Sequence, residues 1–218
     1  MMKHPALALA MLTLFLWGCP AFWVERGPVV TPLRSLERPA LADLPEPDSY
    51  LDRLSDWRRE VRVGLGGQVE AILWDARLGA AGVAHEVAIN HLTPAAARDL
   101  LVQRWQTLYG PQQDRWAIDL NWRFDEQFVS SRRVLEPTGW TFRLHTSQGI
   151  ELAPMRVSVL RLEQAPVDGH WTGSVRLWFS WLDPRRDPVV RGDTTWLRLE
   201  LRHRTGHAEI TWRFPGAW

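Results

Sequence analysis

Histidines next to acidic residues are the first positions in this chain where chemistry could occur. His85 and Glu86 begin like the zinc-protease motif His-Glu-x-x-His, but the next histidine is His91, six positions after the first. At 3.6 residues per turn, that spacing points the two imidazoles to different sides of a helix, so they cannot share one ion. We therefore expect His85 and His91 to be surface or boundary residues.

A second pair of histidines, His203 and His207, flanks the short turn at 205–206. If the segments beside that turn form a hairpin, both imidazoles could approach one metal ion, with Glu209 as the nearest third ligand. Histidines beside a polar turn are more often only solvated. We therefore expect no metal ion at this turn.

Nucleophilic catalysis has no signature in this sequence. The motif Gly-x-Ser-x-Gly is absent, and the one cysteine, Cys19, lies near the start of the chain. Asp119, Asp125 and Glu126 could act as paired carboxylates, although acidic residues on strands and loops are ordinary surface residues. We expect no catalytic residue and no cofactor. A cleft lined by two or more carboxylates or histidines would favour an enzyme instead.

Tryptophan is the unusual feature of the composition, with 14 residues. Most of them belong to apolar rows of strands, but two alternate with charged residues and should leave the polar faces of their strands. Together with their neighbours they give a candidate ligand or partner face: Arg176, Trp178, Trp196, Arg198 and Arg202. Aromatic rings beside arginines could stack on sugar rings or hold a partner protein. Alternatively, helices cover these tryptophans and make them a second core layer.

The start of the chain is typical of an exported protein. Lys3 and His4 precede an apolar run from Ala6 to Trp17, which is too short for the roughly 20 residues of a membrane span. The run ends in Leu16-Trp17-Gly18-Cys19, and this tetrapeptide resembles the lipobox of bacterial lipoprotein precursors. The resemblance implies cleavage before Cys19, a diacylglycerol on its thiol, and membrane anchoring without a transmembrane helix.

The same resemblance implies an organisation and an address. We expect a signal peptide at 1–18, a lipidated cysteine and proline-rich tether at 19–47, and one globular domain at 48–218. A lipobox, a proline-rich tether, a helical segment and a strand-rich half together resemble uncharacterised lipoproteins of Gram-negative bacteria. Pro20 stands where an aspartate would favour the inner membrane, so we expect the periplasmic face of the outer membrane.

Charge and cysteine content exclude some partners and one source of stability. Lys3 is the only lysine, and the 25 arginines that make up the rest of the basic residues balance 25 acidic residues. A balanced charge does not favour nucleic acid as a partner. Without Cys19 the domain has no thiol, so it must be stable without a disulfide.

Periodicity predicts the elements that position these residues. Helical spacing predicts a short helix over 48–60, and alternation predicts strands over 61–65 and 68–77. A helical hairpin is expected at about 80–109, with Thr93 as N-cap and Pro94 at the first helical position. From Trp116 onward, alternating rows predict strands, including one from Glu151 to Leu162 with Pro154 at an edge or bulge. We expect a mainly β chain, an antiparallel, immunoglobulin-like β-sandwich with an inserted helical hairpin.

Three function classes remain open. The first is an envelope lipoprotein with a structural or protein-interaction role. The second is a glycan-binding module that uses the Trp/Arg face, and the third is a hydrolase whose site is not recognised. Fold alone cannot decide among them, because sandwiches carry unrelated functions.

Overall fold

The structure is a computed structural model that describes residues 36–64, 66–129, 132–163, 166–204 and 206–214. Cys19, the rest of the lipobox and the first part of the tether lie outside these described residues, so the lipid anchor stays a prediction. Among the described residues, no helix is both long and apolar enough to cross a bilayer.

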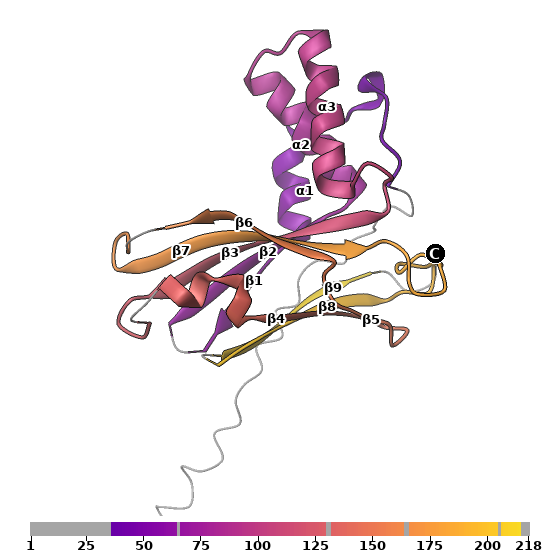
Figure 1. Ribbon diagram of the computed structural model, residues 1–218. Coiled ribbons are helices and arrows are strands. Elements are labelled where there is room, and N and C mark those ends of the chain that lie inside the picture. Colours follow the sequence, from indigo (N-terminus) through magenta and orange to yellow (C-terminus); the bar gives the residue numbers. More distant parts are fainter. Residues whose placement is uncertain (1–35, 65, 130–131, 164–165, 205, 215–218) are drawn as a thin grey trace, which may run out of the picture.

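Two antiparallel sheets lie one above the other, and helices stand on the upper one (Figure 1). The helix-covered sheet contains, in spatial order, β1 (Arg58–Val63), β2 (Gly67–Trp74), β3 (Arg115–Asp125), β7 (His170–Ser180) and β6 (Arg156–Leu162). The uncovered sheet contains β5 (Glu151–Leu152), β4 (Thr141–Thr146), β8 (Trp196–His203) and β9 (Gly206–Arg213). The expected mainly β chain of antiparallel sheets is confirmed, in a sandwich-like arrangement.

Alternate apolar side chains from the two sheets meet in a common core. The ring of Trp122, on β3, lies 4.6 Å from that of Trp140 and 6.2 Å from that of Phe142, on β4, measured between centroids. On β9, the fully buried Trp212 donates its indole N–H to the carbonyl oxygen of Trp57 at 2.8 Å. Most of the tryptophans therefore serve the core, where large aromatic side chains bury much apolar surface.

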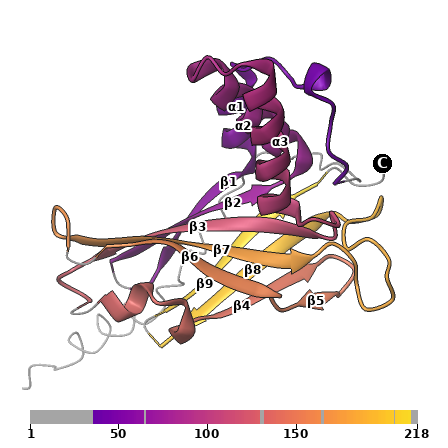
Figure 2. The same cartoon turned by 45° about the horizontal axis from the view of Figure 1, so that its top comes forward.

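The helical hairpin lies between β2 and β3, as predicted, and rests on the outer face of the helix-covered sheet together with α1 (Figures 1 and 2). Its first helix, α2 (Ala76–Ile89), is capped by Asp75, whose Oδ1 accepts from the Leu78 N–H at 2.7 Å. The second, α3 (Pro94–Tyr109), is capped by Thr93. The hairpin begins before the expected residue 80 because the Asp75 cap starts it at Ala76.

Three expected element bounds are wrong. The first helix, α1 (Ser49–Trp57), ends before Glu60, because the chain turns into β1 at Arg58. The strand expected over 68–77 ends at Trp74, where the Asp75 cap begins α2. The strand expected from Glu151 to Leu162 is two strands in different sheets: the chain leaves β5, passes Pro154, and enters β6 as an edge strand with a bulge after Val159. A proline cannot donate to a strand ladder, which favours such a break.

The last part of the expected tether belongs to the folded unit. Leu36 is 4% exposed, and its carbonyl oxygen accepts the indole N–H of Trp105, on α3, at 2.8 Å. A short 3-10 turn (Leu41–Asp43) and the partly buried Leu44 follow along the helices. Residues 36–47 therefore belong to the folded unit, ahead of the expected domain boundary at 48, because Leu36 and Leu44 pack on the core.

Candidate functional site

The predicted Trp/Arg face is divided between the two sheets. Arg176 and Trp178 lie on β7, on the outer face of the helix-covered sheet. Trp196, Arg198 and Arg202 lie on β8, on the outer face of the uncovered sheet. The expectation that these five residues form one face is wrong, because β7 and β8 belong to different layers.

The β7 half of that face is buried under the helices. Trp178 is 6% exposed and donates its indole N–H to the carbonyl oxygen of Thr107, on α3, at 2.9 Å. Beside it, Arg176 is 7% exposed and pairs through two nitrogens with Asp119, at 2.5 and 2.6 Å. Trp74 donates to the same carboxylate at 2.9 Å. These residues form the second core layer considered above, and a soluble ligand cannot stack on Trp178.

The β8 half contributes to an exposed polar surface, which we name the charged face. It consists of outward side chains from all strands of the uncovered sheet, and no helix of the described residues packs on it (Figure 1). Its members are Arg143, His145, Glu151, Trp196, Arg198, Glu200, Arg202, His207 and Glu209. Trp196 is half-buried on this face, and the guanidinium of Arg198 lies 5.4 Å from the centroid of its ring.

Glu200 is the centre of the charged face. It is 8% exposed, and its Oε1 accepts from Arg202 Nε at 2.6 Å and lies 3.1 Å from His207 Nε2. Its Oε2 lies 3.5 Å from His145 Nε2. Burial acts to raise the pKa of this carboxyl, but the hydrogen bond and charge of Arg202 and the bonds of the two histidines outweigh it, so the pKa lies below its usual value. Glu200 is therefore ionised at neutral pH.

Strand register explains why these groups meet. Glu200 stands opposite Glu209 of β9 on one side and Arg143 of β4 on the other. Arg202 stands opposite His207. Directly opposed residues of antiparallel strands have Cβ atoms only about 5 Å apart, so long side chains from neighbouring pairs reach one another.

His203 and His207 do not come together across the turn. His203 lies on the inward-facing side of β8 and stacks on Trp140, with ring centroids 4.8 Å apart. His207 lies on the outward side of β9, on the charged face. Burial, and then the charge of Arg204, lower the pKa of His203. Glu200, rather than His203, is the neighbour of His207 on the charged face. The alternation along β8 already placed Glu200 outward, but sequence alone did not reveal its neighbours across the sheet.

The remaining candidates have structural partners. His85, half-buried, stacks on Tyr50 with centroids 5.0 Å apart, and His91 is exposed. Glu86 pairs with Arg104. Asp125 accepts the N–H of Gln127 at 2.9 Å in the turn after β3. His85 and His91 are therefore surface or boundary residues, as expected.

A cavity of about 310 Å³ lies where the docked N-terminal segment meets the helices. Charged residues of both signs line it, together with apolar ones: Glu37, Pro39, Asp43, Pro45, Arg53, Ala76, Arg77, Ala80 and Trp105. Two carboxylates therefore line one cavity, which was the condition that would favour an enzyme. Two guanidinium groups share the lining, and among the described residues no histidine or hydroxyl side chain does.

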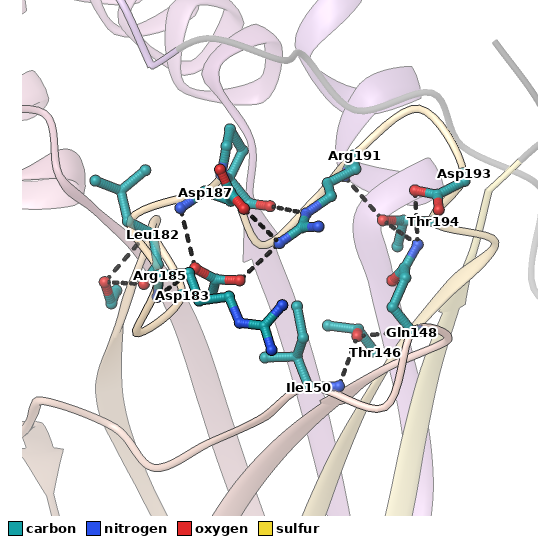
Figure 3. A network of polar contacts seen from close by, with 12 residues as sticks. Thr146, Gln148, Ile150, Leu182, Asp183, Arg185, Asp187, Arg191, Asp193 and Thr194 are labelled. Atoms are coloured by element: carbon teal, nitrogen blue, oxygen red, sulfur yellow. Dashed lines mark hydrogen bonds and ion pairs between the residues drawn. The ribbon is translucent and has the colours of Figure 1, made fainter.

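One end of the uncovered sheet is held by a polar loop (Figure 3). In this loop, between β7 and β8, Asp183 Oδ1 accepts the N–H groups of Arg185 and Asp187 at 2.8 and 3.0 Å, and Oδ2 accepts from Arg191 at 2.6 Å. Thr194, near the end of the loop, accepts from Gln148 at 2.8 Å. The network fixes the chain just before Trp196, so it positions the first residue of β8.

No protein-family model matches this chain, and a search of the curated proteins finds no match. Among solved structures, the chain is similar to a novel protein of unknown function from Burkholderia pseudomallei. The TM-score is 0.49 and the sequence identity 10%, over 80% of this chain and 93% of that chain. A similarity of this degree carries no argument about function.

Proposed function

We propose that this chain is a lipid-anchored protein of the bacterial cell envelope whose uncovered sheet presents the charged face to a protein partner. The anchor is the diacylglyceryl group on Cys19, and the expected address is the periplasmic face of the outer membrane. The observation that supports an interaction role best is the charged face itself, a set of opposed charges that no helix of the described residues covers.

The segment between the lipid and the fold sets how far the domain can stand from the membrane. Leu36 is docked on the folded unit, so the spacer after Cys19 extends no further than residue 35. Fully extended, the stretch from Cys19 to Leu36 reaches at most about 60 Å. The partner of this proposal therefore lies within the envelope, near the membrane that holds the lipid.

The mixed charges of the charged face favour a protein partner whose surface carries the complementary charges. Acidic and basic residues are interspersed on the face, and they alternate along β8, so the face has no single sign that would attract a simple polyanion. Glu200 and Arg202 hold each other in place, while Arg202 and His207 remain exposed. The half-buried Trp196 with Arg198 above it supplies the aromatic and arginine pair that often anchors protein interfaces.

Two alternatives rest on narrower observations. A glycan could stack only on Trp196, because α3 covers Trp178 and removes half of the expected platform. A hydrolase would use Glu37 and Asp43, the carboxylates of the cavity, and replacing both by amides would abolish its activity on an envelope substrate.

We also retain as a proposal that the sandwich is immunoglobulin-like, since two antiparallel sheets share one core.

Metabolic labelling with a clickable palmitate analogue tests the anchor. We expect label on the natural chain, none on Cys19→Ala, and release of that variant into the soluble fraction. Label absent from both chains would refute the lipobox, and the chain would then be secreted free or held by its uncleaved signal.

Photo-crosslinking in cells tests the interaction. A photoreactive residue at Arg202, on the charged face, is expected to crosslink to a partner, whereas one at Arg161, on the exposed edge strand β6, is the matched control. Arg198→Glu, introduced beside the Arg202 probe, should abolish the adduct. Equal crosslinking from both positions would contradict a partner specific to the charged face.

A further inference from the structure

Three groups of the charged face have the chemistry and spacing of metal ligands. His207 Nε2 lies 3.1 Å from Glu200 Oε1 and 3.9 Å from Glu209 Oε1. The three ligand atoms all lie within 4.8 Å of one another. They come from adjacent strands, β8 and β9, whose register places Glu200 directly opposite Glu209.

This spacing fits a small tetrahedral ion. Zinc binds imidazole nitrogen and carboxylate oxygen at about 2.0–2.2 Å, so two ligand atoms of a tetrahedral site stand about 3.4 Å apart. The observed 3.1 and 3.9 Å separations bracket that value. His207 and Glu209 are exposed, so these two side chains are the ones that would shift to close the triangle around the buried Glu200. We propose that Glu200, His207 and Glu209 form a binding site for a divalent transition metal of the zinc class.

The surrounding residues hold two of the ligands in position. Arg198 contacts Glu209 Oε2 at 3.3 Å, so Oε1 is the oxygen that remains directed toward His207. Arg202 donates to Glu200 Oε1 at 2.6 Å, so it orients this carboxylate while sharing the oxygen that faces His207. Such outer groups orient metal ligands.

The ligand set also selects among metals. An imidazole with two carboxylates suits zinc, copper and nickel, whereas calcium and magnesium prefer oxygen ligands alone. The two arginines add positive charge near the ion, so the site is expected to bind more weakly than a buried zinc centre. The fourth coordination position would be filled by water from the solvent or by His145. The Nε2 atom of His145 lies 3.5 Å from the other oxygen of Glu200.

Metal titration of the full-length chain tests the site. After treatment with a chelator, the chain is titrated with Zn²⁺ by calorimetry and with Co²⁺ by visible absorption, whose intensity reports tetrahedral coordination. We expect one equivalent of each ion to bind. His207→Ala should weaken binding at least about tenfold, and Glu209→Gln should do the same while keeping a side chain that Arg198 can hold.

His91→Asn is the matched control, because it removes an exposed histidine at the end of α2 and asparagine tolerates the positive φ of 49° found there. It should bind zinc like the natural chain. Binding that is unchanged in both His207→Ala and Glu209→Gln would overturn the site, and so would no binding at millimolar zinc. Circular dichroism confirms that each variant is folded. The result does not depend on the lipid or on a partner, so it is separate from the test of the proposed function.

Discussion

Asp119 and Arg176 form a two-point ion pair between β3 and β7, beneath the helices that cover this sheet. The oxygen–nitrogen distances are 2.5 and 2.6 Å, and both residues are less than a tenth exposed. Trp74 donates to the same carboxylate. The pair lets charged residues lie in a buried layer, since each charge has a partner and the carboxylate accepts a further hydrogen bond from Trp74.

Arg176→Met is expected to destabilise the protein strongly. The methionine fills similar space but leaves the Asp119 charge buried and unpaired, which costs about 3–5 kcal/mol. The double variant Asp119→Leu with Arg176→Met should recover much of that loss, since no charge remains buried. Urea unfolding measures both. If the double variant is no more stable than Arg176→Met, the loss does not come from an unpaired buried charge.

Trp178→Phe and Trp196→Phe separate the two halves of the expected Trp/Arg face. The first leaves the carbonyl of Thr107 without the indole N–H and opens a small gap under α3, at a cost of about 1–3 kcal/mol. The second keeps a ring below Arg198 on a half-buried position and should change stability by about 0.5 kcal/mol or less. Thermal unfolding of the two variants compares them directly, and equal losses would mean that Trp178 is not docked on α3.

The sequence predicted strands well because alternation is a local property. It placed the apolar rows of β3, β4, β7, β8 and β9 correctly, and it placed the hairpin between two strands through the Thr93 cap. The break at Pro154 was predicted as an irregularity, but not as a crossing between sheets. Which sheet a strand joins depends on contacts far along the chain, and periodicity does not contain that information.

The candidate site was predictable only in part, for the same reason. Arg176 and Arg198 both alternate with a tryptophan, so local pattern treats them alike. One is covered by helices and the other is not, and this depends on where the inserted hairpin docks. Glu200 and His207 meet only through the register of β8 with β9, which no single-strand pattern gives.

Two glycines of α2 should respond oppositely to alanine. A Cβ at Gly79 would overlap the Tyr109 hydroxyl, which donates to the Asp75 carbonyl at 2.6 Å. A Cβ at Gly82 would lie 3.5 Å from Tyr50, an ordinary contact. We expect Gly79→Ala to cost about 2 kcal/mol net, and Gly82→Ala to stabilise by up to about 1 kcal/mol through helix propensity. The denaturant midpoints of the two variants measure these changes in stability. A Gly79→Ala variant that is more stable than the natural chain would mean that Tyr109 is free to move.

Acid should weaken the loop before β8 through Asp183. Burial acts to raise the pKa of this carboxyl, but the N–H groups of Asp187 and Arg185 and the charge of Arg191 outweigh it, so the pKa lies below its ordinary value of 3.8. A carboxyl with a lowered folded-state pKa contributes stability above its unfolded-state pKa. That contribution is lost as the pH falls through the folded-state value.

Asp183→Asn should therefore be less stable than the natural chain at pH 7, and the difference should shrink as the pH falls below about 4. Urea midpoints of both chains between pH 7 and pH 3 measure that difference. Asp187→Asn is the control, since its carboxylate is exposed and only 3.4 Å from Arg191 in a surface pair, which contributes little. A gap for Asp183→Asn that stays constant across this range would show that the lost stability does not come from the charge of the carboxylate.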